Sequence, residues 1–210
     1  MIIKPVLQLP KTIRFLNENE LPGNNLPVFK RWEESKNANI VEGYTLTLKD
    51  NNPENNALGF RFYAEINIDN PKLWALMLAL SETLPDEVAF LFGHVDFDLN
   101  YGNYQDKEGT LDFITQYQYE LAEDAFINYG LIYHDEQTLI EVFVDESKYV
   151  KYWGVDEGWF RAIMEEFGLK EVKGLEFVDE YPKVREALTV LDEKALDSKS
   201  LIELFAQKYL

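Results

Sequence analysis

The chain has 210 residues, 38 of them acidic and 20 basic, which gives a formal net charge of −18 at pH 7. Such a charge disfavours binding to nucleic acid and to anionic membranes, because both need clustered lysine and arginine side chains. The sequence contains no cysteine, and this excludes disulfides, thiolate catalysis and cysteine-based zinc sites.

Length and composition favour a single folded domain. Hydrophobic residues make up 46% of the chain, which is enough for one core, and no linker-like segment divides the sequence. We predict one domain over residues 1–210, with a loop-rich extension at 1–39 and a C-terminal helix at 192–210.

The apolar segments favour a cytoplasmic protein that is not membrane-bound. Pro5, Gln8 and Pro10 interrupt the apolar start of the chain, so this start does not resemble a signal peptide. The longest apolar run, residues 73–80, is too short to cross a bilayer. The absence of cysteine agrees with a reducing compartment.

The first part of the chain predicts a β-hairpin. Residues 44–48 and 58–68 alternate apolar and polar side chains, and this period of two indicates strands with one buried face. Turn-forming residues fill 50–56 between them, which favours a hairpin. We also expect a short helix near 29–35 and a mostly apolar helix at about 71–82.

The middle of the chain predicts a strand, a loop and a helix. Residues 88–99 have the composition of a strand, and 102–109 read as a loop. Apolar residues at helical intervals predict a helix at about 111–128, ended by Gly130.

The last part predicts more helices and one more hairpin. In chain order we expect a hairpin of 131–134 with 139–144, a helix capped by Asp156 and closed by Gly168, a strand at 172–178, a helix at 182–191, and a final helix opened by a Ser200–Glu203 capping box. This irregular order predicts an α+β fold. We expect a mixed, largely antiparallel sheet with hairpins, packed by about four to five helices.

The negative charge is concentrated in one region. Residues 81–147 hold sixteen acids and a single base, Lys107, whereas 1–80 are neutral overall and 148–210 are nearly so. Aromatic residues alternate with these acids, which indicates a folded element with an acidic outer face. A solvated surface without any partner explains the same pattern.

One stretch suggests metal binding or acid–base chemistry. On a single strand, His94, Asp96 and Asp98 would share one face, and an imidazole with two carboxylates can hold a divalent cation or act as a base. An ordinary strand with one wet face predicts the same alternation. His94 and Asp98 would also lie about 13 Å apart at about 3.3 Å per residue.

Residues 149–169 carry a resemblance to a known class of proteins. They read Tyr-Val-Lys-Tyr-Trp-Gly-Val-Asp-Glu-Gly-Trp-Phe-Arg-Ala-Ile-Met-Glu-Glu-Phe-Gly-Leu. Together with the acidic middle, this segment loosely resembles small acidic immunity proteins of bacterial polymorphic-toxin systems. The resemblance implies a bacterial cytoplasmic inhibitor that blocks a cognate toxin by surface complementarity, and it carries over no functional residues.

Our main hypothesis is a non-enzymatic acidic binding protein that docks a basic protein, such as a toxin nuclease. The hypothesis rests on electrostatic complementarity together with exposed aromatic side chains. The candidate partner-binding residues are Asp96, Asp98, Tyr101, Tyr104, Asp106, Glu108, Glu120, Glu123, Asp124, Tyr152 and Trp153.

Two alternatives remain open at this stage. The first is a metal-dependent or carboxylate-driven hydrolase that uses the 94–98 strand, with a metal site of His94, Asp96 and Asp98. The second is a structural or assembly protein. The sequence predicts no cofactor, apart from the divalent cation of the first alternative, and it does not indicate an oligomeric state.

Overall fold

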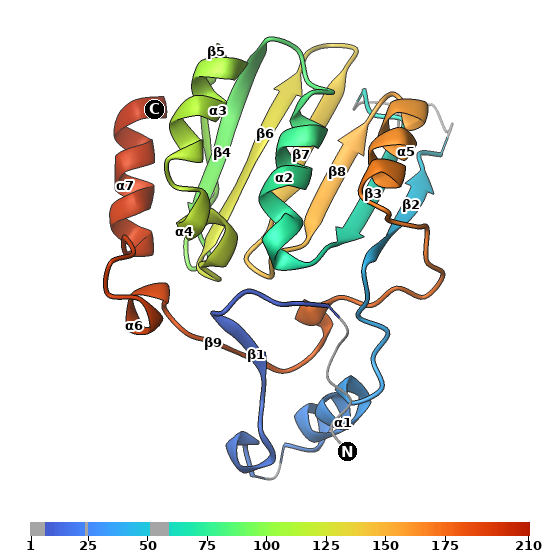
Figure 1. The fold of residues 1–210 in the computed structure, drawn as a ribbon, viewed down its shortest axis with the longest axis vertical. Coiled ribbons are helices and arrows are strands. Elements are labelled where there is room, and N and C mark those ends of the chain that lie inside the picture. Colours follow the sequence, from blue (N-terminus) through green and yellow to red (C-terminus); the bar gives the residue numbers. More distant parts are fainter. Residues whose placement is uncertain (1–6, 24, 51–58) are drawn as a thin grey trace.

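The computed structural model describes residues 7–23, 25–50 and 59–210 of the chain (Figure 1). Its strands are β1 (Ile13–Phe15), β2 (Gly43–Leu48), β3 (Phe62–Asn67), β4 (Glu87–His94), β5 (Asn100–Asp106), β6 (Ile127–His134), β7 (Leu139–Val144), β8 (Val150–Gly154) and β9 (Lys183–Arg185). Its helices are α1 (Leu26–Ser35), α2 (Asn70–Ser81), α3 (Lys107–Thr115), α4 (Gln118–Glu123), α5 (Glu157–Glu166), α6 (Leu188–Leu191) and α7 (Ser198–Tyr209), with 3-10 turns η1 (Glu18–Glu20) and η3 (Val178–Glu180).

The fold is built on one seven-stranded sheet with the order β2-β3-β8-β7-β6-β4-β5. All its neighbouring strands run antiparallel, and β1 pairs with β9 in a separate small sheet. The predicted α+β class and the largely antiparallel sheet are therefore confirmed. In the described part of the chain, no helix is long and apolar enough to cross a membrane.

The helices α2, α3, α4, α5 and α7 all lie over the same face of the large sheet (Figure 1). The core forms between them, because alternate residues of each strand point toward the helices. Helix α2 lies over the middle of the sheet and buries Leu73, Leu76, Met77 and Leu80 completely. Its apolar surface on nearly every side, expected from the sequence, suits this central place.

The C-terminal helix α7 covers the β4–β5 end of the core. Its Phe205 and Tyr209 rings pack against Phe90 of β4, with centroid distances of 5.1 Å each. Tyr209 also approaches Gly102 of β5, where an added Cβ would lie 3.1 Å from the Tyr209 Cβ. This close packing holds β5 as the last strand of the sheet.

Both predicted hairpins are present. Strands β2 and β3 pair antiparallel, although most of the turn predicted at 50–56 lies outside the described residues. Strands β6 and β7 pair around Asp135, whose Oδ1 accepts the N–H groups of Gln137 and Thr138. Helix α5 begins at the predicted cap, since Asp156 Oδ1 accepts the Trp159 N–H at 2.9 Å.

The middle of the chain differs from the prediction in three places. The strand expected at 88–99 ends at His94, and the expected loop at 102–109 is strand β5 followed by helix α3. The expected helix at 111–128 is two shorter helices that precede β6. Gly130 lies inside β6 rather than at a helix end, because the alternation from Ile127 onward outweighs the helical spacing.

The C-terminal third also differs from the prediction. Residues 149–154, expected to lead into a helix, contain strand β8, while 172–178 and 182–191 form mainly loops with β9 and the short α6. The last helix begins at Ser198 and not at the Ser200–Glu203 box. Its cap is Asp197, whose Oδ1 accepts two backbone N–H groups, and an acidic side chain suits this end of the helix.

Gly130 gives a direct test of the β6–β7 register. A Cβ at this position would lie 2.4 Å from the Val142 backbone oxygen, so we expect Gly130→Ala to lower the free energy of unfolding by about 2 kcal/mol or more. Urea denaturation would measure the loss. Gly23→Ala is the matched control, because an added Cβ there meets no atom within 4 Å. An unaffected Gly130→Ala variant would contradict the register.

Candidate functional site

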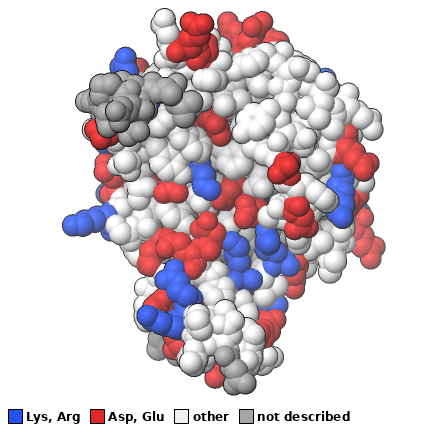
Figure 2. Space-filling model, turned by 180° about the vertical axis from the view of Figure 1, so that it is seen from behind, with Lys and Arg blue, Asp and Glu red and all other residues white. Residues whose placement is uncertain are grey.

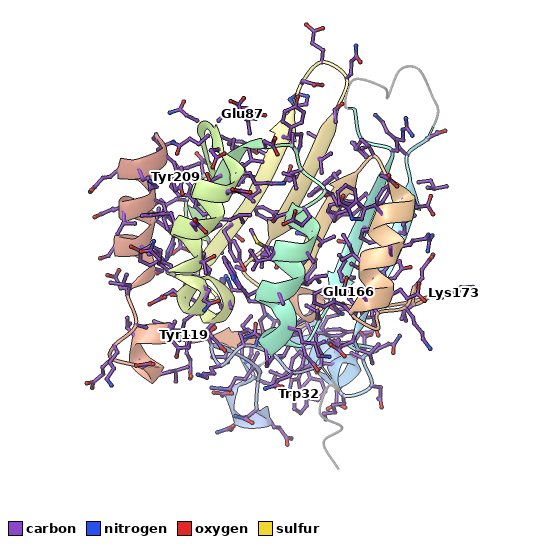
Figure 3. The ribbon with its side chains drawn as sticks, turned by 45° about the horizontal axis from the view of Figure 1, so that its top comes forward. Trp32, Glu87, Tyr119, Glu166, Lys173 and Tyr209 are labelled. Atoms are coloured by element: carbon purple, nitrogen blue, oxygen red, sulfur yellow. The ribbon has the colours of Figure 1, made fainter. Side chains whose placement is uncertain are left out.

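Six exposed carboxylates gather where β4 begins and β5 ends. We call this surface the acidic edge, and it consists of Asp86, Glu87, Asp106, Glu108, Asp135 and Glu136. Figure 3 shows Glu87 at this end of the sheet. Of the ion pairs found among the described residues, none involves these six side chains.

Backbone and side-chain contacts hold the acidic edge together. Glu87 of β4 faces Asp106 of β5, and Glu108 follows in the first turn of α3. Tyr104 connects β5 to the β6–β7 turn, because its hydroxyl accepts the His134 N–H at 2.8 Å. The carboxylates of that turn therefore lie near those of β4 and β5.

The single base of residues 81–147 is removed from this surface. Lys107 is buried, and its Nζ donates to the backbone oxygens of Leu84 at 2.8 Å and Ser81 at 3.4 Å. These carbonyls belong to the end of α2 and the turn after it, where a cation is favourable. The ammonium charge is therefore directed into the molecule, and the carboxylates remain on its surface.

The acidic edge brings two like charges face to face. Because the Lys107 N–H donates to the Asp86 oxygen, Glu87 and Asp106 form a pair of the kind without direct backbone hydrogen bonds, in which side chains lie closest. Like charges in this position are destabilising. Asp106 has a structural reason to be acidic, since its Oδ2 caps α3 at the Gly109 N–H. The Glu87 side chain has no hydrogen-bond partner among the described residues.

The sheet face opposite the helices carries three of the predicted aromatic residues. Tyr101 is 63% exposed and Tyr104 47% exposed on β5, and Trp153 lies on β8. Strand register places one row of side chains across this face, namely Thr47, Tyr63, Trp153, Glu141, Ile132, Ala89 and Tyr104. Figure 2 shows this side of the molecule, with red side chains along its upper rim.

Glu141 is the member of this row that sequence reasoning missed. Its side chain is partly buried between Trp153 of β8 and Ile132 of β6, and burial raises the pKa of its carboxyl to about 7. Among the described residues it has no hydrogen-bond or ion-pair partner. In the sequence it looked like an ordinary solvent-facing position of a hairpin strand.

Four predicted partner-binding residues make internal contacts instead. Glu120 accepts the Leu196 N–H at 3.1 Å, and Glu123 accepts the Lys11 N–H at 2.7 Å. Asp124 is 2% exposed and Tyr152 is 1% exposed, so neither side chain reaches the surface. Asp124 Oδ1 accepts the Phe126 N–H, and the Tyr152 hydroxyl donates to Thr83 Oγ1.

The shared strand face expected for His94, Asp96 and Asp98 does not form. Strand β4 ends at His94, so the two aspartates lie in the turn that follows. His94 is buried and stacks on Phe126, and its Nδ1 accepts the Asp96 N–H at 3.2 Å. In the described ranges no group of three or more His, Asp or Glu side chains could hold a metal ion.

The two aspartates are also separated from the acidic edge. That edge lies at the start of β4, near Glu87, whereas Asp96 and Asp98 follow the end of the same strand. An eight-residue strand spans about 25 Å at about 3.3 Å per residue. The acids of 81–147 therefore form more than one surface.

No family model, curated protein or solved structure matches this chain. Its function is therefore inferred from the chemistry of these surfaces. The acidic edge offers exposed carboxylates with the Tyr104 ring beside them, and such a surface suits contact with a cationic surface.

Glu87 allows the like-charge contact to be measured. We expect Glu87→Gln to raise the free energy of unfolding by about 0.2–1 kcal/mol at low ionic strength, because one of the two facing charges is removed. The gain should shrink near 1 M salt, where the Debye length is about 3 Å. Urea titrations would show both effects. The exposed Glu193 provides the control Glu193→Gln, and a destabilised Glu87→Gln would contradict the repulsion.

Glu141 predicts a pH-dependent stability. Its pKa rises from 4.5 in the ordinary state to about 7 in the folded protein, so the folded state binds more protons between these values and stability falls as pH rises through them. Glu141→Gln lacks this titration. We expect it to exceed wild type by about 1–3 kcal/mol near pH 8 and to match it near pH 4. A pH-independent difference in urea denaturation would refute the assignment.

Proposed function

We propose that this chain is a non-enzymatic binding protein that docks a basic protein partner through the acidic edge. The observation that supports this most directly is the burial of Lys107, which leaves six exposed carboxylates without a neighbouring base from the same segment. A surface of one sign attracts a partner of the opposite sign over long distances and speeds the encounter.

Tyr104 beside the carboxylates, and Tyr101 further along β5, add the short-range part of such an interface. Tyr101 and Tyr104 are large, partly apolar and carry a polar tip, which is the kind of side chain that dominates binding energies. Tyr104 is held in place by its bonds with the His134 backbone. A side chain that is already positioned loses little entropy when a partner docks.

A toxin nuclease is the partner class that we favour. Proteins that act on nucleic acid carry clustered lysine and arginine in their substrate groove, and an acidic protein can occupy such a groove in place of phosphates. The loose resemblance of residues 149–169 to immunity proteins of polymorphic-toxin systems agrees with this partner class.

The contact residues that we now propose differ from those predicted from the sequence. Tyr104, Asp106 and Glu108 lie at the acidic edge or next to it, and Tyr101 lies about 16 Å from Asp106 along β5. In contrast, Glu120, Glu123, Asp124 and Tyr152 have structural contacts of their own. Asp86, Glu87, Asp135 and Glu136 join the set. These four acids come from β4 and from the β6–β7 turn.

Charge neutralisation at the acidic edge would test the proposal. We expect the native chain to capture members of a panel of basic nucleases at about 50 mM salt and to release them near 500 mM, because screening weakens the attraction. The quadruple variant Glu87→Gln, Asp106→Asn, Glu108→Gln and Glu136→Gln should bind at least about tenfold more weakly. Asparagine at 106 keeps a helix cap.

A second quadruple variant provides the matched control. Glu165, Glu166, Glu193 and Glu203 are exposed acids away from the acidic edge, and changing all four to glutamine alters the net charge equally. Biosensor titrations should show binding close to wild type for this control. An equal loss of affinity in both variants would show that net charge alone, and not the acidic edge, explains the binding. Binding that does not depend on salt would overturn the electrostatic proposal.

A further inference from the structure

The sheet face opposite the helices continues the surface of the acidic edge toward the centre of the molecule. Tyr104, Ala89, Ile132 and Glu141 stand side by side on four successive strands. Strands are spaced about 4.8 Å apart, so Glu141 lies about 14 Å from Tyr104 across the sheet. A partner that covers Tyr104 can therefore also reach Glu141.

Among the described residues Glu141 has no cationic partner, whereas Asp145 on the same side of the sheet has one. Asp145 of the β7–β8 turn pairs with Lys151, whose Nζ lies 3.1 Å from its Oδ2. Lys151 Nζ also lies over the Tyr149 ring, 4.9 Å from its centroid. Lys151 is thus already engaged, and Glu141 remains as a partly buried carboxylate beside Trp153.

We propose that Glu141 and Trp153 form the receptor for one lysine or arginine side chain of the basic partner. The cationic group would pair with the Glu141 carboxylate while its stem or guanidinium plane lies on the Trp153 ring. This assignment rests on the proposed docking function and names the chemistry at its centre. The site combines Trp153, which was predicted from the sequence, with Glu141, which was not.

Physical chemistry favours a cation at this position. The free protein already carries the cost of removing water from Glu141, so a cation gains attraction without the full desolvation that a surface carboxylate would require. A guanidinium or ammonium over an indole adds about 0.5–2 kcal/mol. Ile132 on the other side excludes water from the pair.

The same burial makes docking dependent on pH. With a pKa of about 7, Glu141 is about one-tenth ionised at pH 6 and about nine-tenths ionised at pH 8. Titratable side chains that share this face are Tyr63 and Glu65 on β3, Lys151 on β8, Asp145 of the β7–β8 turn, His134 on β6, Glu87 on β4, and Tyr104 and Asp106 on β5. Burial also raises the pKa of Asp145 to about 6, so the test must separate Asp145 from Glu141.

An octa-arginine peptide is a suitable probe, with the uncharged octa-citrulline peptide as its control. Isothermal titration calorimetry of wild type should show an affinity that rises about tenfold from pH 6 to pH 8, following the ionised fraction of Glu141. Glu141→Gln should bind about tenfold more weakly at pH 8 and lose the pH dependence. A pH dependence that persists in Glu141→Gln would assign it to another group and overturn the inference.

Tryptophan fluorescence gives a second readout that folding defects do not imitate. Peptide binding should change the emission of wild type, and Trp153→Phe should abolish most of that change while the peptide still binds through Glu141. Persistence of the full change in Trp153→Phe would show that the peptide docks elsewhere. Thermal unfolding of both variants establishes that they are folded.

The quadruple variant of the acidic edge separates this inference from the proposed function. It should weaken peptide binding but retain the pH dependence, because Glu141 is intact. If the quadruple variant weakens binding and Glu141→Gln does not, the proposed function stands and the Glu141 receptor is wrong. If wild type fails to bind octa-arginine, or if neither variant weakens binding, both proposals are wrong.

Discussion

The placement of Lys107 is the interaction on which the shape of the acidic edge depends. Its backbone N–H joins the start of β4 at the Asp86 oxygen, and its Nζ joins the end of α2. One residue therefore connects α2, β4, β5 and α3. Because the ammonium satisfies carbonyls that would otherwise be unpaired in the interior, it stabilises the fold and leaves the surrounding carboxylates uncompensated.

An antiparallel sheet with helices on one face needs no cover on the other. In this protein the pairing of charged side chains differs between the two ends of that uncovered face. Near the small sheet, Asp145 and Lys151 pair with each other, and Lys183 donates to Ser147 Oγ. Toward the acidic edge, Glu141 and the six edge carboxylates form no ion pair with another described residue. Destabilising features that persist without a structural benefit are typical of surfaces selected for binding.

The sequence predicted the parts of the fold that depend on local pattern. Both hairpins followed from alternation and turn residues, and α5 followed from its Asp156 cap. Strand β5 was missed because Asn100–Asp106 is polar and glycine-containing, as an exposed edge strand is free to be. Glu141 was missed because its neighbours Trp153 and Ile132 come from other strands, and strand order is a non-local property.

Long-range and short-range electrostatics have different physical origins at this surface. The exposed carboxylates act through solvent, so salt within a Debye length of about 8–10 Å weakens them, and they govern how fast a partner arrives. Glu141 acts only on contact and in a drier environment, so salt affects it less and protonation affects it more. A partner held by both would associate at a rate set by ionic strength and dissociate at a rate set by pH.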